Sequence, residues 1–386
     1  MTMLSSTADL SSRMRRMRRS LHVICFFLCA LVIAELVFRL FGIGYPLFTQ
    51  NDEWTGFALR PGTAGWVQEG ETTYVSINSA GMRDHEHAKE KPANTVRIAV
   101  LGDAYAEARQ VDIENTFWSV MEKELGQCAQ RQGKQVEVLN FGVSGFTTAQ
   151  ELLHLHTRVW EFNPDVVLLA FNAEENVRGN SAALSGMHDR PLMSMNDGNL
   201  TIDLSFRDQP SYRKQSSPLA SLKLHTLQRS RIAQIAGYVL TRPRGAANDD
   251  GSVYKQTTSS QWTEAWNITE TILRQMHGEV KGHGAKFIIV TVSSNIQAHP
   301  DRSRRGATAK ALGVPDLFGP DRRIAMLGAE DGFTVLNLAE AFSNLAQEQR
   351  LFLHGKDGEG YWNARGHQEA GKTIATVVCG GGFLEE

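Results

Sequence analysis

Five short apolar runs, each with the composition of a buried parallel strand, recur along the chain at 96–101, 136–141, 166–171, 286–292 and 334–338. Segments with apolar residues at helical spacing separate them. Repeated strand–helix units predict one mostly parallel sheet covered by helices on both faces, a three-layer α/β/α, flavodoxin-like architecture over residues 96–380. Ligand sites in such sheets lie at the carboxyl ends of the strands. A functional site is therefore expected at the loops after residues 101, 141, 171 and 292 and at the segment before the last helix.

Two stretches interrupt this alternation. Residues 44–95 are rich in turn formers and predict an extended lead-in with short strands such as 73–77. Residues 178–261 are polar and too long for a simple loop, which predicts an insertion. We expect it to hold a hairpin at Asn196-Asp197-Gly198 and a helix around 219–240. Within the regular part, Thr148-x-x-Glu151 has the pattern of a capping box.

The N-terminus predicts a membrane anchor. An arginine-rich segment, 1–20, precedes an apolar run that extends to about residue 43. Residues 21–43 are long enough to span a bilayer, and no small-residue cleavage site follows, so an uncleaved anchor is favoured over a cleaved signal peptide. Glu35 and Arg39 can pair one helical turn apart. The positive-inside rule then keeps the arginines cytoplasmic and predicts a single-pass bacterial inner-membrane protein whose bulk is periplasmic.

The net charge and the cysteine content argue against two classes of function, nucleic-acid binding and metal binding. The formal net charge of -2 argues against a nucleic-acid binder. Cys25 and Cys29 fall in the apolar run, which leaves Cys128 and Cys379 for the rest of the chain. A disulfide between these two is conceivable, but we expect two free buried thiols. The cysteine and histidine spacings match no metal-binding pattern, so neither a metal nor another cofactor is expected.

Four segments carry a family resemblance, three at predicted strand ends and one before the last helix. Residues 97–122 read RIAVLGDAYAEARQVDIENTFWSVME, 139–153 read LNFGVSGFTTAQELL, 164–180 read PDVVLLAFNAEENVRGN, and 351–367 read LFLHGKDGEGYWNARGH. In this order they resemble blocks I, II, III and V of the SGNH (GDSL-type) hydrolases. The lead-in INSAGMRD at 77–84 also resembles membrane-anchored members of the group. The resemblance spans roughly residues 70–380.

That resemblance implies ester chemistry, with a serine nucleophile, a histidine base oriented by aspartate, and an oxyanion hole that includes a glycine N–H and an asparagine. The residues at these positions do not fit it. The positions of the nucleophile, the base, its aspartate and the oxyanion asparagine hold Ala104, Tyr361, Gly358 and Glu175, and Gly145 alone is retained. A methyl group cannot attack a carbonyl, and a phenol is a poor base at neutral pH. We therefore expect the protein to be inactive as a serine hydrolase.

Other residues near these blocks are candidates for lining the pocket. These are Asp103, Tyr105, Ser144, Glu174, Asp357 and Glu359. Asp103 is expected to support the turn beneath the nucleophile position, and Ser144 to be a turn residue. His354 reads as a surface-loop histidine, and His367 as a packing residue at the start of the last helix.

Three functions remain open. The first is a pseudoenzyme that binds a glycan or a protein partner in the cell envelope. The second is an active esterase or acyltransferase on cell-surface polysaccharide that uses displaced residues. The third is a carboxylate- or metal-based hydrolase built from the acidic residues at this end of the sheet. A serine hydroxyl or cysteine thiol hydrogen-bonded to a histidine would favour the second, and carboxylates about 5–9 Å apart would favour the third.

Overall fold

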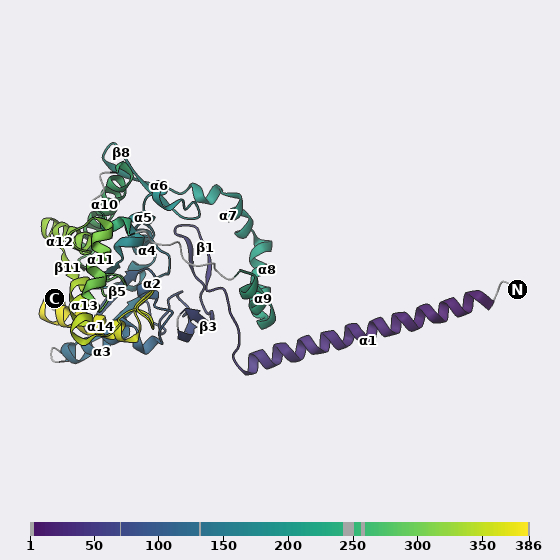
Figure 1. Ribbon diagram of the computed structural model, residues 1–386. Helices are drawn as coiled ribbons and strands as arrows, with labels where there is room; N and C mark the ends of the chain where they lie inside the picture. Colours follow the sequence, from purple (N-terminus) through teal and green to yellow (C-terminus); the bar gives the residue numbers. More distant parts are fainter. Residues whose placement is uncertain (1–3, 70, 131–132, 242–250, 256–258, 385–386) are drawn as a thin grey trace. The chain divides into compact units, whose positions relative to one another are not determined.

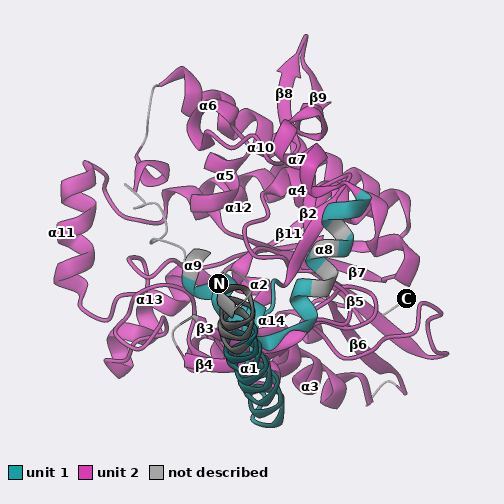
Figure 2. Ribbon diagram, turned by 90° about the vertical axis from the view of Figure 1, so that its right-hand side faces the viewer, with its two compact units in different colours: residues 1–47, 218–244 teal, residues 48–217, 245–386 magenta. Residues whose placement is uncertain are grey.

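The computed structural model describes residues 4–69, 71–130, 133–241, 251–255 and 259–384, so parts of the predicted 178–261 insertion lie outside the described residues. Its contacts divide the chain into two compact units (Figure 2). Unit 1 comprises residues 1–47 and 218–244, and unit 2 comprises 48–217 and 245–386.

Unit 1 contains the helices α1 (Leu4–Leu40), α8 (Pro218–Arg229) and α9 (Arg231–Thr241). The part of α1 from Arg16 to Leu40 is long and apolar enough to cross a membrane, a test that an N-terminal signal sequence also passes. The single helix predicted around 219–240 is wrong, since the structure has two helices that meet at Ser230. Ser230 Oγ accepts a hydrogen bond from Ala233 N at 3.3 Å, so this residue starts a new helix as serine commonly does.

The centre of unit 2 is a five-stranded sheet that confirms the predicted strands. It contains β5 (Thr95–Gly102), β6 (Gln135–Asn140), β7 (Val166–Phe171), β10 (Lys286–Thr291) and β11 (Thr334–Asn337). The spatial order is β11-β10-β7-β5-β6, and every neighbouring pair is parallel. Numbered along the chain, this is the 2-1-3-4-5 order of flavodoxin-like folds. Chain order reverses between β5 and β7, which makes their carboxyl ends the favoured place for a ligand.

Helices cover both faces of this sheet (Figure 1). Alternate residues of β5 divide between two cores: Ile98 and Val100 pack into one, and Ala99 and Leu101 into the other. The first core includes α3 (Phe117–Gln130), α13 (Leu338–Gln349) and α14 (Ala364–Gly380). The second includes α4 (Thr148–Thr157), α10 (Ser260–Gly282) and α12 (Gly319–Asp331). The three-layer prediction is thus confirmed.

Smaller elements surround the sheet. The lead-in forms two hairpins, β1 (Thr49–Asp52) with β2 (Gly56–Leu59) and β3 (Ala64–Glu69) with β4 (Glu71–Ser76), and β4 overlaps the strand predicted at 73–77. The hairpin predicted at Asn196-Asp197-Gly198 is β8 (Leu192–Asn196) with β9 (Asn199–Asp203). The remaining helices are α2 (Ala104–Glu107), α5 (Ala173–Gly179), α6 (Ala182–Ser185), α7 (Pro210–Gln215) and α11 (Arg302–Leu312), with 3-10 turns at Ile113–Asn115, Val159–Phe162, Ser205–Asp208 and Ser252–Tyr254.

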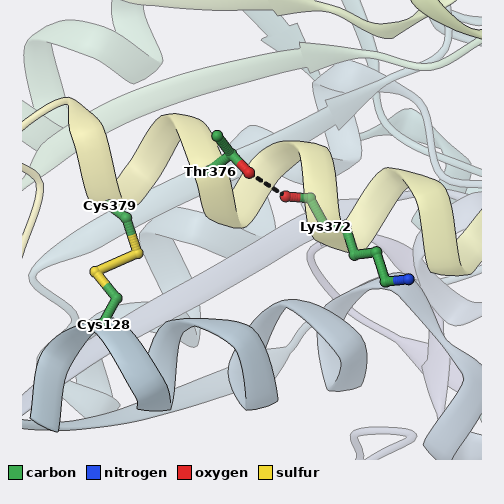
Figure 3. The surroundings of a disulfide bond; sticks show 4 residues. All are labelled: Cys128, Lys372, Thr376 and Cys379. Carbon is green, nitrogen blue, oxygen red and sulfur yellow. Dashed lines mark hydrogen bonds between the residues drawn. A yellow bond between two sulfur atoms is a disulfide. The ribbon is translucent and has the colours of Figure 1, made fainter.

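The expectation of two free thiols is wrong. Cys128 and Cys379 form a disulfide between α3 and α14 (Figure 3). These helices pack against each other on the same face of the sheet, which brings the two Cα atoms within 6.3 Å although 251 residues separate them in sequence. That Cα separation lies within the usual range for disulfides. Spacing along the chain could not reveal this proximity.

Candidate active site

The turn after β5 is built to present a side chain at the edge of the sheet. Asp103 caps the short helix α2, and its Oδ1 accepts a hydrogen bond from Tyr105 N at 2.9 Å. Gly102 has φ +154°, and a Cβ there would lie 2.9 Å from that of Ala106, so the turn requires glycine. The presented residue, at the position the resemblance assigns to the nucleophile, is Ala104. Its side chain is a methyl group.

Aromatic rings pack beside this turn. Tyr105 is buried and contacts Tyr361 and Trp362 edge to face, with ring centroids 5.1 and 5.0 Å apart. Tyr361 donates a hydrogen bond from Oη to Oε1 of Glu175 at 3.2 Å. The residues that the resemblance places at the base and oxyanion positions, Tyr361 and Glu175, are therefore in direct contact with each other.

Asp103 lies beneath the turn, where it joins two loops. Its Oδ2 accepts a hydrogen bond from Asn172 Nδ2, the N-cap residue of α5, at 2.9 Å. The Asp103 side chain is completely buried, and burial together with the charge of Glu175 raises its pKa to about 7. These bonds match the structural role expected for Asp103, and its burial keeps it from touching a ligand directly.

Glu151 is a buried acid that the sequence reading missed. The predicted capping box of Thr148 and Glu151 is wrong by one residue, because Thr147 is the N-cap and Gln150 Oε1 accepts from Thr147 N at 3.1 Å. Glu151 points into the protein, where Oε2 accepts from Asn176 Nδ2 at 3.2 Å and Oε1 has no hydrogen-bond partner among the residues that the structure describes. Burial first, and then the charge of Asp103, raises the Glu151 pKa well above its ordinary value. An acid in the first turn of a helix is usually exposed, so the sequence carried no signal for this.

The lead-in motif clamps the loops at the sheet edge. Arg83 is buried and donates hydrogen bonds to the backbone carbonyls of Glu107, Ala108 and Val111, just after the β5 turn. Asp84 accepts from Asn140 N at 2.8 Å, at the end of β6. The INSAGMRD segment thus positions two loops at once, a role that its sequence resemblance alone did not indicate.

The loop after β6 contains the retained glycine. Gly145 has φ +82°, a conformation that favours glycine, and its carbonyl accepts a hydrogen bond from Arg190 Nη1 at 2.7 Å. The backbone N–H of Ser144 donates to Oε2 of Glu107 at 2.6 Å. This bond ties the β6 loop to helix α2, beside the turn that presents the alanine.

In the loop before α14, position 358 does not readily accept an aspartate. Gly358 has φ +84°, and a Cβ there would lie 2.5 Å from the ring of Phe352. Its neighbours Asp357 and Glu359 are exposed, and Glu359 Oε2 accepts from Asn295 Nδ2 at 2.8 Å. An aspartate at 358 would need both a strained backbone and a displaced ring.

No protein-family model matches the chain. An arylesterase from Vibrio mimicus is 26% identical over 125 residues, which is 32% of this chain and 60% of the arylesterase. An acetyl xylan esterase structure covers 73% of this chain and 100% of its own, at 12% identity and a TM-score of 0.39. The structure of an acetylxylan esterase from Geobacillus stearothermophilus covers 75% of this chain and 94% of its own, at 12% identity and a TM-score of 0.37. That of a protein of the G-D-S-L family from Desulfitobacterium hafniense covers 73% of this chain and 99% of its own, at 13% identity and a TM-score of 0.35.

The strand order and the places of the four blocks, three at the ends of β5, β6 and β7 and one before α14, decide the fold. The chain has an SGNH hydrolase-like fold. Relative to that fold, the edge of the sheet is complete in its backbone: the glycine turn after β5, the glycine loop after β6 and the capped helices α5 and α14 are all present. What differs from an SGNH esterase is the set of side chains that the backbone presents.

Two buried histidines near the SGNH-like site are held by structural contacts. His354 is 1% exposed, so the expectation of a surface-loop residue is wrong; its Nε2 lies 2.9 Å from Ser293 O. His367 Nε2 lies 3.1 Å from Gln110 Nε2, and its ring stacks on Phe117. Burial lowers the pKa of His354 to about 4 and that of His367 to about 3, so both are neutral at pH 7.

Glu174 connects the site to the loop after β10, because burial and then the charge of Glu174 raise the pKa of Tyr105, and the Glu174 carboxylate is bonded by Tyr254. The Tyr254 hydroxyl donates to Oε1 of Glu174 and lies 2.8 Å from Ser294 Oγ, in the loop after β10. Across the described parts of the chain, no group of three or more histidine, cysteine, aspartate and glutamate side chains is arranged to hold a metal ion. An open pocket of about 710 Å³ lies elsewhere, along α3 and α14 beside the disulfide, and its lining includes Lys372 and Thr376 (Figure 3).

Proposed function

We propose that this protein is a membrane-anchored, extracytoplasmic SGNH-like pseudoenzyme that binds a glycan or a protein partner at the old catalytic edge of its sheet. The observation that carries the proposal is the hydrogen bond between Tyr361 and Glu175 beside Ala104. At the positions where an esterase has a nucleophile, a base and an oxyanion donor, this chain has a methyl group, a phenol and a carboxylate.

The chemistry of these side chains suits binding. Tyrosine rings stack against the apolar faces of sugar rings, and Tyr361 is partly exposed, with its ring held edge to face by the buried Tyr105. The exposed carboxylate of Glu175 disfavours anions. A neutral or cationic sugar therefore fits better than an acidic one.

Two features support the location. The apolar part of α1 follows an arginine-rich start, which keeps that end cytoplasmic if the helix spans the inner membrane. The Cys128–Cys379 disulfide is typical of a protein that folds in an oxidising compartment such as the periplasm. A C-terminal alkaline-phosphatase fusion should therefore be active, and an active cytoplasmic reporter at the same point would contradict this topology.

An ester-hydrolysis assay tests the loss of catalysis. Full-length protein in nanodiscs is compared with Ala104→Ser and with the double variant Ala104→Ser/Tyr361→His, using aryl acetates and acetylated xylan fragments. The wild-type protein should not exceed the background rate, since removing triad members costs factors of about 10³ to 10⁶. Wild-type turnover that saturates with substrate would contradict the proposal and favour displaced catalytic residues.

A further inference from the structure

Unit 1 links the N-terminal helix to two helices that follow almost 180 residues later. The carboxylate of Glu35, in the last turns of α1, accepts hydrogen bonds from Arg231 N at 3.0 Å, from Ile232 N at 3.1 Å and from Ser230 Oγ at 3.1 Å. The first N–H groups of a helix have no partner within the helix and carry partial positive charge. Glu35 therefore caps the start of α9 from a different helix.

Arg39 completes the link. Its Nε donates to Glu35 Oε1 at 2.8 Å, as the sequence spacing predicted, and its Nη2 donates to the carbonyl of Arg229, the last residue of α8. One ion pair on α1 thus holds the C-terminus of α8 and the N-terminus of α9 together. The sequence did not predict the contacts of Glu35 and Arg39 with α8 and α9.

Two more contacts join the same segments. Leu47 N donates to Gln228 Oε1 at 2.8 Å, and the ring of Tyr45 stacks on that of Tyr238 at 4.3 Å and 13°. The α8–α9 hairpin, residues 218–241, is therefore fixed to the chain between residues 35 and 47 by four contacts: the Glu35 helix cap, the hydrogen bond from Arg39 to the Arg229 carbonyl, the hydrogen bond from Leu47 N and the Tyr45–Tyr238 ring stack.

The hairpin also exposes large apolar side chains. Leu219 is 77% exposed, Leu222 64% and Val239 69%, and Leu227 is exposed as well. Removing apolar surface of this size from water is favourable. A cluster of such residues on short helices marks a surface that contacts an apolar partner.

The position of Ser230, where the two helices meet, points to the membrane surface as that partner. The apolar span of α1 ends at Leu40, and Glu35 precedes it by five residues, or about 7 Å along the helix at 1.5 Å per residue. A helix whose first N–H groups bond to Glu35 starts within this distance of the membrane boundary. Interfacial helices bury their apolar faces about 5–10 Å into that same zone.

We propose that the α8–α9 hairpin is a second membrane element, lying in the outer interface of the bilayer with Leu222 and Val239 among the lipid chains. This inference rests on α1 being a membrane anchor, as proposed above. The Glu35 cap also explains how a carboxylate is tolerated inside an apolar span, since a paired and hydrogen-bonded charge costs far less there than a bare one. Arg39 and the exposed Arg229 lie where phosphate headgroups are found.

Spin-label accessibility tests the proposal on the full-length protein in phosphatidylethanolamine/phosphatidylglycerol nanodiscs. The background is Cys25→Ala/Cys29→Ala, which leaves only the disulfide-bonded cysteines. Single labels are placed at Leu222→Cys and Val239→Cys, with Ile33→Cys as the position within the span and Glu348→Cys as the exposed control in unit 2. Collision with oxygen reports lipid, and collision with a water-soluble nickel chelate reports solvent.

The labels at 222 and 239 should favour oxygen over nickel several-fold more than the label at 348, as the label at 33 should. Nickel accessibility at 222 and 239 equal to that at 348, with 33 in lipid, overturns the hairpin proposal and leaves the anchor intact. Low accessibility to both reagents means that protein covers the hairpin, which also overturns it. Solvent exposure at 33 would instead show that the anchor itself fails.

The tether has its own test. Glu35→Ala removes the cap, so the label at 239 should shift measurably towards nickel, whereas Glu71→Ala, at an exposed position of strand β4, should leave it unchanged. An unchanged depth at 239 in Glu35→Ala would show that the contacts with Glu35 do not set the position of the hairpin.

Discussion

The hydroxyl of Tyr361 donates to Oε1 of Glu175 at 3.2 Å, which joins the loop before α14 to helix α5 across 186 residues of sequence. In an SGNH esterase the same two positions belong to a base and to an oxyanion donor. Here the Tyr361 hydroxyl uses its one hydrogen in a bond to Glu175, and Glu175 has a carboxylate where the esterase has a hydrogen-bond donor. The pair is suited to holding a neutral or cationic group and unsuited to stabilising an oxyanion.

The charge of Glu175 should therefore set ligand preference. On an array of neutral, amino-sugar and uronic-acid oligosaccharides, the full-length protein should favour neutral and cationic glycans. Glu175→Gln should reduce the discrimination against acidic glycans several-fold, because it removes the exposed charge and keeps a hydrogen-bond acceptor for Tyr361. Glu348→Gln, on the surface of α13, is the matched control. Preferential binding of acidic glycans by the wild type would contradict this assignment.

Glu151 should make the protein less stable as pH rises. Its folded-state pKa is raised well above the ordinary value, so the folded state keeps its proton while the unfolded chain loses it above about pH 4.3. The stability contributed by protonated Glu151 is complete below that pH and declines as pH rises. Glu151→Gln should therefore gain stability relative to wild type, by up to about 1.4 kcal/mol per pH unit between pH 5 and 7.

Thermal unfolding midpoints of wild type, Glu151→Gln and Glu348→Gln at pH 5, 6 and 7 measure this difference. Comparison between variants removes the opposing effect of His354 and His367, whose lowered pKa values make the folded state lose stability as pH falls below about 6.5. Midpoints for Glu151→Gln that run parallel to wild type across this range would show that Glu151 is ionised in the folded state.

The disulfide should be present in protein isolated from an oxidising compartment. Denatured protein should then show two reactive thiols, those of Cys25 and Cys29, and four after reduction. The double variant Cys128→Ser/Cys379→Ser should be less stable by about 2–5 kcal/mol, since the bond closes a very long loop. Four reactive thiols before reduction would contradict both the pairing and the proposed side of the membrane.

The sequence predicted the sheet because each buried parallel strand is a continuous apolar run, as at 96–101 and 166–171. It also assigned residues to the SGNH positions from the order of the blocks, and that assignment stays a prediction. It could not predict that Tyr361 meets Glu175 or that Cys128 meets Cys379, because these contacts depend on how distant elements pack. Glu151 was misread for a different reason: a polar residue beside an apolar stripe looks the same whether it faces solvent or an internal asparagine.

The helix at 219–240 shows the same limit on a local scale. Its apolar spacing runs through Ser230, so periodicity alone predicts one helix. The break forms because Ser230, Glu35 and Arg39 together satisfy the end of one helix and the start of the next. A partner almost 200 residues away decides where the helix ends.

The most direct test of the central claim is labelling with a fluorophosphonate probe, which reacts covalently with activated serines. Full-length protein in nanodiscs is incubated with probe, digested and examined by mass spectrometry, beside an active serine esterase and the Ala104→Ser/Tyr361→His variant. The wild-type protein should remain unlabelled, because Ala104 offers no oxygen and Tyr361 no efficient base. Stoichiometric labelling of wild-type Ser144, or of any other serine in the chain, would show that the nucleophile has moved and that this protein is an enzyme.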